Sequence, residues 1–268
     1  MPIFSGAAEQ IRAIAYSDKA AVSDLAESIL RDPGMTTKLL RISNSVAFNT
    51  SGEPIATVSR AIVMLGFDKV QEVVSTVASV DTLLHGPARE RVLRQMTRSF
   101  HAAVQARWLA VKRFDEEPEE VFIASLLYHF GELAFWHFAG DVGGAIDQAQ
   151  KADPQRAGEI EYEMLGFRLR QLTVALAGEW RICPLLRSAL KGSHVRQSRE
   201  EGIVIAHRLA ESLENGWDSE LARERMKEVG KYLNVPVEAI AGEIVDNAID
   251  SARIAAEFSA TTAAALSS

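Results

Sequence analysis

Residues 24–48 read DLAESILRDPGMTTKLLRISNSVAF, and residues 55–74 read IATVSRAIVMLGFDKVQEVV. Apolar residues recur at spacings of three and four through both stretches, which predicts amphipathic helices. Asp32-Pro33 predicts a helix start, because an aspartate can cap first-turn N–H groups and the first helical residue needs no N–H of its own. Gly66 stands where a helix end calls for a positive φ angle. This part of the chain should therefore form several short helices joined by tight turns.

The helical spacing continues along the rest of the chain. No stretch of strand length alternates apolar and polar residues, and Pro and Gly fall mostly between the periodic segments. Ser23 and Thr57 are expected to be N-caps, and Asp68 with Gln71 resembles a capping box. Helices are therefore expected at 4–16, from Ser23, from Pro33 to near Asn44, from Thr57, from Asp68 onward, at 90–113, 119–138, 155–165, 167–180 and 184–192, and about three times within 200–259. The sequence predicts an all-α, multi-helical bundle.

Composition and charge exclude several classes of protein. The chain has 268 residues and a formal net charge of −7, which argues against sequence-independent binding to nucleic acid. Its one cysteine, Cys183, cannot form a disulfide framework and fits a reducing compartment. The N-terminus lacks the basic and apolar regions of a signal peptide, and no apolar run approaches the ~18 residues of a spanning helix. We expect a cytoplasmic protein that binds neither nucleic acid nor membrane.

The two quoted stretches resemble the first half of the HD-related output domain, abbreviated HDOD, a bacterial signalling module. The resemblance rests on Asp32-Pro33, on residues 39–45 and on the Ala61-Ile62 step that leads to Leu65-Gly66. Further along, EEVFIASLLYHFGEL (119–133) resembles the stretch that leads into the HD-like helix of the family. The resemblance covers about residues 2–200, and it implies an all-α fold related to the HD metal-dependent phosphohydrolases.

A domain organisation follows from the resemblance and from one strong break. The segment LHGPAR (84–89) is the clearest interruption in the helical pattern. We expect an HDOD-like domain over 2–199, divided into an N-terminal lobe of about 2–84 and an HD-like lobe of about 88–199. The helices of 200–259 should pack on the HD-like lobe. The tail at 260–268 has nothing large to bury and should fray.

In the HD enzymes, a His, an adjacent His-Asp pair and a distant Asp bind the divalent metal that activates water. The resemblance places the His-Asp pair on Tyr128 and His129, and further family positions on Ser99, Leu169 and His194. Only two of these five side chains are imidazoles, and none is a carboxylate or a thiolate. We therefore expect neither a bound metal nor a catalytic residue, and we expect no cofactor. Tyr128 would fill the space of the lost ion and bond to His194 or to backbone.

The other histidines have two open interpretations. His101 and His129 are either remnants of a metal site with unusual ligands or helix residues with ordinary hydrogen bonds. The second interpretation is favoured, because no carboxylate accompanies them at an HD spacing. His85, His137 and His207 are expected to be structural or surface groups.

The most informative polar residues of the first half are Arg41, Asn44 and Ser45. They either form part of a recognition surface, or Asn44 and Ser45 cap a helix end while Arg41 pairs with an acid. The second interpretation is favoured for all three, and Asp32, Pro33 and Gly66 join them as motif positions with a structural or an interaction role.

Three other features carry less weight. Residues 57–80 have the outline of a helix-turn-helix, but the second helix lacks a basic face, so a hairpin inside the domain is favoured over DNA binding. Cys183 has no base beside it and is expected to be a small buried residue. The acidic run at 116–120 suits a helix N-terminus and needs no partner.

The resemblance and the missing ligands together predict a non-catalytic signalling module that acts through protein contacts. Two alternatives remain open: a divergent metal-dependent phosphohydrolase, or a sensor that binds a nucleotide or a cyclic dinucleotide. Bound metal or hydrolysis of a generic phosphodiester would distinguish the enzyme from the module.

Overall fold

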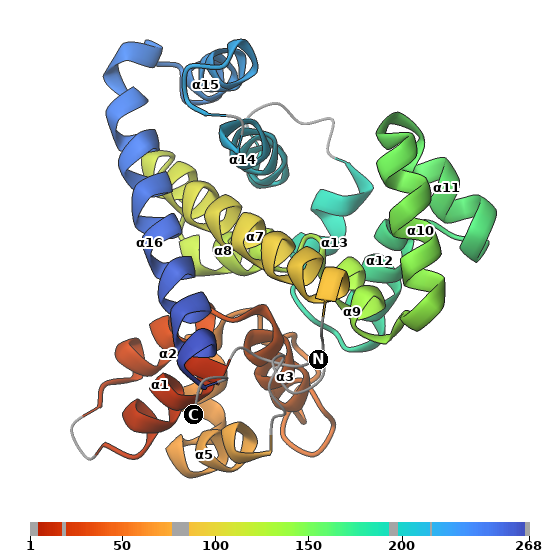
Figure 1. Cartoon of the computed structure of the whole chain (residues 1–268). Coiled ribbons are helices and arrows are strands. Elements are labelled where there is room, and N and C mark those ends of the chain that lie inside the picture. The colour runs from red at the N-terminus through yellow and green to blue at the C-terminus, as the bar shows by residue number, and fades with distance from the viewer. Residues whose placement is uncertain (1–4, 18–19, 77–85, 193–197, 215, 266–268) are drawn as a thin grey trace.

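The computed structural model describes residues 5–17, 20–76, 86–192, 198–214 and 216–265 (Figure 1). Every regular element in these ranges is helical, so the predicted all-α fold is confirmed. The helices are α1 Ser5–Ala15, α2 Val22–Leu30, α3 Pro33–Ser43, α4 Val58–Leu65, α5 Phe67–Ser75, α7 Gly86–Lys112, α8 Pro118–Leu126, α9 Phe130–Phe138, α10 Gly140–Ala152, α11 Ala157–Leu165, α12 Leu169–Glu179, α13 Pro184–Lys191, α14 Arg199–Leu213, α15 Glu220–Leu233 and α16 Ala241–Ala265. Short 3-10 turns at Pro154–Arg156 and Val237–Ala239 precede α11 and α16.

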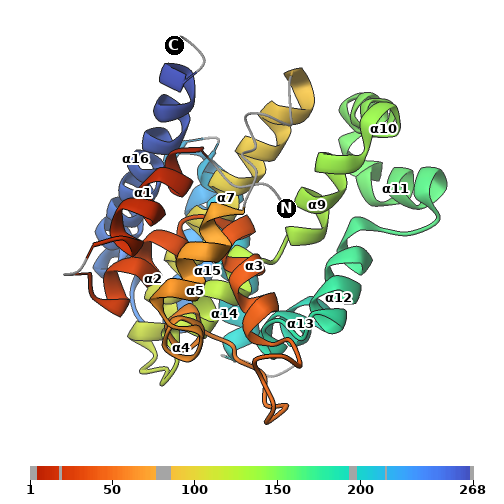
Figure 2. The same ribbon diagram turned by 90° about the horizontal axis from the view of Figure 1, so that it is seen from below.

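Helices α1 to α5 pack on one another and form the N-terminal lobe (Figure 2). Two of their starts follow local chemistry. The Asp32 carboxylate accepts the Met35 N–H at 2.8 Å, and the Thr57 hydroxyl accepts the Arg60 N–H at 3.4 Å. Gly66 ends α4 with a φ of +79°. The predicted caps at Asp32 and Thr57 and the positive φ at Gly66 are therefore confirmed.

Two predicted starts are wrong. Helix α2 begins one residue before Ser23, because the Asp24 carboxylate accepts the Ala21 N–H at 3.2 Å and so caps the helix from its first turn. Helix α5 begins at Phe67, directly after Gly66, and Asp68 lies inside its first turn. Gln71, the expected partner of Asp68, instead donates its amide to the carbonyl oxygen of Ala15 at the end of α1. The expected continuation of this helix through Val80 lies outside the described residues.

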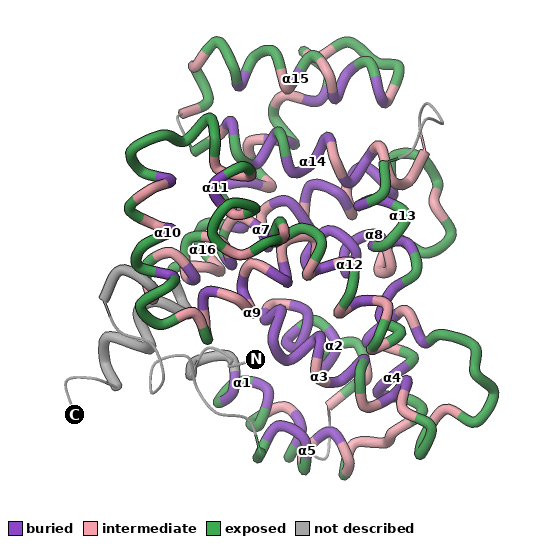
Figure 3. Tube along the Cα trace, turned by 90° about the vertical axis from the view of Figure 1, so that its right-hand side faces the viewer, coloured by how far each residue is buried: buried purple, intermediate pink, exposed green. Residues whose placement is uncertain are grey.

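The long helix α7 is the axis of the remaining helices and packs against α8, α9, α14 and α16. Figure 3 shows buried residues along α7, α8 and α14. The helix expected at 119–138 is divided into α8 and α9 by a turn at Leu127–His129. The sequence pattern also missed α10, because Gly140, Gly143 and Gly144 dilute its apolar spacing.

Two side-chain contacts join the N-terminal lobe to the other helices. The Glu119 carboxylate, on α8, accepts the Ser59 N–H at 3.0 Å and the Ser59 hydroxyl at 2.7 Å, so it caps the N-terminus of α4. The Arg41 guanidinium lies 5.0 Å from the centroid of the Trp180 ring. These contacts tie α4 to α8 and α3 to the end of α12.

The helices after residue 200 contact both the N-terminal lobe and the helices around α7. Helix α14 packs on α7 and α8, and α16 packs on α7 and also on α1 (Figures 1 and 2). Helix α16 extends to Ala265, so residues 260–265, which were expected to fray, are helical; their alanines favour a helix intrinsically.

Within the described residues, Pro118–Phe138 is long and apolar enough to cross a membrane by length and composition. It spans α8, the turn and α9, and 61% of its apolar window is buried inside the fold. Leu126, Phe130 and Leu133 are among its core residues. The apolar residues of this segment therefore form part of the core of the fold.

The Asp32 cap gives a test of the N-terminal lobe. Replacing Asp32 with Ala removes the bond to the Met35 N–H and should lower the free energy of unfolding by about 1 kcal/mol. Asp68→Ala is the matched control, because Asp68 is exposed and caps no helix, so its effect should stay within about 0.5 kcal/mol. Urea denaturation of both variants measures the difference, and an unchanged midpoint for Asp32→Ala would show that the cap contributes nothing.

Candidate functional site

The turn at Leu127–His129 places Tyr128 and His129 between α8 and α9. His129 precedes the first residue of α9, and its Nδ1 lies 2.6 Å from an Oε1 oxygen of Glu132, one turn further along. The carboxylate can only accept when ionised, so Nδ1 carries the hydrogen and donates. At the position where the resemblance expects the aspartate of the His-Asp pair, this chain has an imidazole that is hydrogen-bonded to a carboxylate of the helix that follows it.

His207, on α14, lies against this turn and was not expected there. Its ring centroid is 4.5 Å from that of Tyr128 and 5.1 Å from that of His129. Its Nε2 lies 3.0 Å from the carbonyl oxygen of Ser125, and that oxygen can only accept, so Nε2 carries the hydrogen. Nδ1 has no partner among the described residues. Burial drives the pKa of His207 well below its ordinary value, with a smaller effect in the same direction from His129, so the ring is neutral at pH 7.

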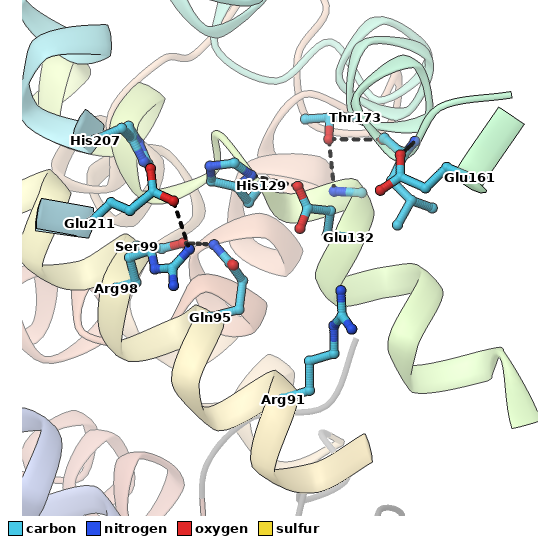
Figure 4. Close-up of polar contacts among 12 residues, drawn as sticks. Arg91, Gln95, Arg98, Ser99, His129, Glu132, Glu161, Thr173, His207 and Glu211 are labelled. Atoms are coloured by element: carbon cyan, nitrogen blue, oxygen red, sulfur yellow. Dashed lines mark hydrogen bonds and ion pairs between the residues drawn. The ribbon is translucent and has the colours of Figure 1, made fainter. Parts of the chain in front are cut away.

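Ser99 and Leu169 offer no ligand chemistry. The Ser99 hydroxyl, on α7, is buried and accepts the Gln95 amide at 3.3 Å (Figure 4). The Leu169 side chain is buried at the start of α12, where its N–H donates to Glu161 at 2.9 Å. Gly131 lies so close to the start of α12 that a Cβ there would be 2.9 Å from the Leu169 carbonyl oxygen. The structure therefore brings Leu169 near the turn through its backbone. The fifth position, His194, and its expected bond to Tyr128 lie outside the described residues.

Two arginines of α7 place positive charge beside Glu132. Burial raises the pKa of Glu132, but His129, Arg91 and Arg98 outweigh burial and hold that pKa below its ordinary value. Glu132 is therefore ionised at neutral pH among three nitrogen-bearing side chains (Figure 4).

Both arginines are themselves fixed by other helices. Arg98 makes a two-pronged contact with Glu214 of the α14 end, at 2.6 and 2.8 Å. Arg91 lies 2.6 Å from Asp147 of α10, and its guanidinium carbon is 3.8 Å from the centroid of the Trp136 ring. The positive charges beside Glu132 are thus held by α9, α10 and α14.

The donor set does not fit a divalent metal ion. No group of three or more His, Cys, Asp or Glu side chains has the arrangement of a metal site in the described part of the chain. Glu132, the nearest carboxylate, is bonded to His129, and the charges of Arg91 and Arg98 oppose a cation. Hydrolytic metal sites ordinarily need about three protein ligands, and among the described residues only two imidazoles, those of His129 and of His207 on α14, are available here.

The acidic run at 116–120 has partners that its sequence did not predict. Glu119 caps α4, as described above, and Glu120 lies 2.7 Å from Arg199, the first residue of α14. Arg199 also lies 2.8 Å from Asp115. The run therefore ties both α4 and α14 to the start of α8.

Cys183 is buried, as the sequence predicts, and has a φ of +41°. Burial, with a smaller contribution from Glu120, raises the pKa of its thiol to about 12. A thiol of this kind is protonated at neutral pH and is a poor nucleophile.

The polar residues near the end of α3 have mainly local contacts. Asn44 donates to the carbonyl oxygens of Leu40 at 3.0 Å and Ile55 at 2.9 Å, and accepts the Ile55 N–H at 2.8 Å. Ser45 donates to Ile42 at 2.7 Å. The acid partner favoured for Arg41 is not found among the described residues; its guanidinium lies over the Trp180 ring instead.

Comparisons with known proteins agree with the fold. The family model described as "HDOD domain" matches residues 1–195. The MmoQ response regulator from Methylococcus capsulatus str. Bath superimposes with a TM-score of 0.71 at 21% identity, covering 91% of this chain and 97% of that chain. A virulence factor from Campylobacter jejuni subsp. jejuni superimposes with a TM-score of 0.68 at 19% identity, covering 94% and 93%. An HDOD domain protein of unknown function from Geobacter sulfurreducens gives 0.54 at 19% identity, covering 96% and 93%. No curated protein matches the sequence significantly.

The buried His207 predicts a specific pH dependence of stability. The pKa of His207 is lower in the folded chain than in the unfolded chain. Below the ordinary pKa of about 6.5, the unfolded chain therefore binds a proton that the folded chain does not. The free energy of unfolding consequently falls as the pH falls. Between pH 7 and pH 5, His207→Gln should lose less free energy of unfolding than the wild type, by up to about 2 kcal/mol. Urea denaturation at both values measures this difference, and an equal loss in the two proteins would contradict a neutral buried His207.

Proposed function

The chain belongs to the HDOD domain family, and from that premise we propose that it is a non-catalytic output module of bacterial signal transduction. The module acts in the cytoplasm through contacts with a protein partner. Two structural neighbours carry the names response regulator and virulence factor, which supports a regulatory role.

The observation that carries the non-catalytic part is the charge arrangement at the α8–α9 turn. Where the resemblance expects the His-Asp pair, this chain has Tyr128 and His129; the Glu132 carboxylate accepts a hydrogen bond from His129, and the charges of Arg91 and Arg98 lower its pKa. Glu132 therefore already has a hydrogen-bond donor and two arginine side chains near it, which disfavours its use as a ligand for a metal ion. Without a metal to lower the pKa of water, the turn has no group that generates a hydroxide at neutral pH.

Protein contacts are favoured over nucleic acid for a separate reason. The net charge is −7, and the apolar faces of α4 and α5 are buried inside the N-terminal lobe through Val58, Ile62, Val70 and Val74. In the described part of residues 57–80, the apolar faces of both helices therefore belong to the core. This part has no basic surface that could contact DNA.

Phosphodiester hydrolysis tests the proposal. The full chain is incubated with bis(p-nitrophenyl) phosphate and with a cyclic dinucleotide, each in the presence of manganese, iron or magnesium. We expect no metal-dependent turnover. The double variant Tyr128→His/His129→Asp should also stay inactive, because Ser99 and Leu169 still supply no ligand and Arg91 and Arg98 remain.

His129→Ala is the matched control for this assay. Turnover by the wild type that requires a metal and is lost in His129→Ala would overturn the proposal and favour the divergent phosphohydrolase. Metal-dependent turnover that co-purifies with both proteins at a constant specific activity would also contradict the non-catalytic assignment and would place the activity away from the α8–α9 turn.

A further inference from the structure

A cavity of about 250 Å³ lies away from the α8–α9 turn, between α2, α7, α8 and α16. Figures 1 and 2 show how α16 passes along α7 toward the N-terminal helices. The walls of the cavity come from both lobes and from a helix beyond the end of the family match at residue 195. Cavities where separate parts of a fold meet are common sites for small molecules.

The inner wall of the cavity is apolar and aromatic. Phe100 of α7 and Phe122 of α8 pack edge to face, with ring centroids 6.0 Å apart and an interplanar angle of 78°. Leu30, Val104 and Ile254 extend this wall. Phe100 and Phe122 are almost fully buried, whereas Val104 and Ile254 are partly exposed, so the wall offers a small apolar surface to a bound group.

The rim carries charge that the protein leaves only partly compensated. Three arginines and two carboxylates line the cavity, and Asp250 pairs with Arg253 at 3.4 Å. Among the described residues, no carboxylate lies within ion-pair distance of the guanidinium of Arg31 or Arg107. The Arg107 guanidinium carbon is 5.0 Å from the centroid of Phe122, so its charge lies directly beside the aromatic wall.

We propose that this cavity binds a small monocarboxylate with a flat apolar body. The carboxylate pairs with Arg107 and Arg31, since a guanidinium presents two parallel N–H groups to a carboxylate. The apolar body packs on Val104 and Ile254, beside the edges of Phe100 and Phe122. The single net positive charge of the lining favours a monoanion over a dianion such as a phosphate monoester.

The size of the cavity limits the occupant. Pockets for drug-sized molecules measure roughly 300–1,000 Å³, and this cavity is smaller, at about 250 Å³. A bound molecule would touch α2, α7 and α16 at once and so join the N-terminal lobe to the C-terminal helix. This site does not depend on the signalling assignment or on the chemistry at the α8–α9 turn.

Binding of phenylacetate to the full chain tests the proposal. Isothermal titration calorimetry at pH 7 and low salt should detect phenylacetate binding to the wild type. Its neutral analogue phenylacetamide should bind about tenfold more weakly, because a charged hydrogen bond contributes roughly 1.5–3 kcal/mol. Arg107→Gln should weaken phenylacetate binding by about the same factor.

Two further variants make the result decisive. Arg94→Gln is the matched control, because Arg94 is an exposed arginine on α7, the helix of Arg107, and lies outside this cavity. The affinity of this variant for phenylacetate should equal that of the wild type. Arg31→Gln repeats the test on α2 if Arg107→Gln fails to fold, which thermal unfolding without ligand reveals.

Three results would overturn the proposal. They are no binding of phenylacetate to the wild type at millimolar concentration, equal affinity for phenylacetate and phenylacetamide, or equal weakening by Arg94→Gln and by the cavity variants.

Discussion

The short contact between His129 and Glu132 is the interaction on which the arrangement of the candidate site depends. It fixes the first turn of α9 against the preceding turn, and it leaves an ionised carboxylate half-buried at the point where α7, α9 and α14 meet. A buried carboxylate is costly unless cations accompany it. Arg91 and Arg98 supply that charge from α7, and each is in turn held by an acid of another helix, Asp147 on α10 or Glu214 at the end of α14. In the polar network of the site, each buried charge thus lies beside a side chain of opposite charge.

The helices that follow residue 195 contribute to this region of the fold. The family match ends at residue 195, yet His207 packs on Tyr128 and His129, and Arg199 pairs with Asp115 and Glu120 at the start of α8. Helix α14 therefore completes the site from outside the matched range. The acidic start of α8 also reaches the N-terminal lobe, since Glu119 caps α4 through Ser59. Residues 115–120 act as a junction among three parts of the chain.

Features set by neighbouring residues could be predicted from the sequence, and features set by tertiary packing could not. The Asp32 and Thr57 caps and the φ of Gly66 depend on a few adjacent residues, and the structure has them as predicted. Ser23 and Asp68 are equally good caps by composition, but Asp24 and Gly66 define those helix starts instead. The glycines of α10 hid a helix, and one of them, Gly143, has no room for a side chain, because a Cβ there would lie 2.7 Å from the Cβ of Ala139. No local signal places His207 beside the α8–α9 turn or Arg41 over Trp180, because their partners lie far away in the sequence.

If the proposed function is right, the α8–α9 turn, with its His129–Glu132 hydrogen bond and the nearby Arg91 and Arg98, holds no metal ion. Elemental analysis tests it most directly, on wild-type protein and on His129→Ala, both produced in medium supplemented with zinc, manganese and iron and purified without chelators. We expect each metal to stay far below one equivalent per chain, with no difference between the two proteins. One equivalent of any of these metals in the wild type, lost in His129→Ala, would contradict it.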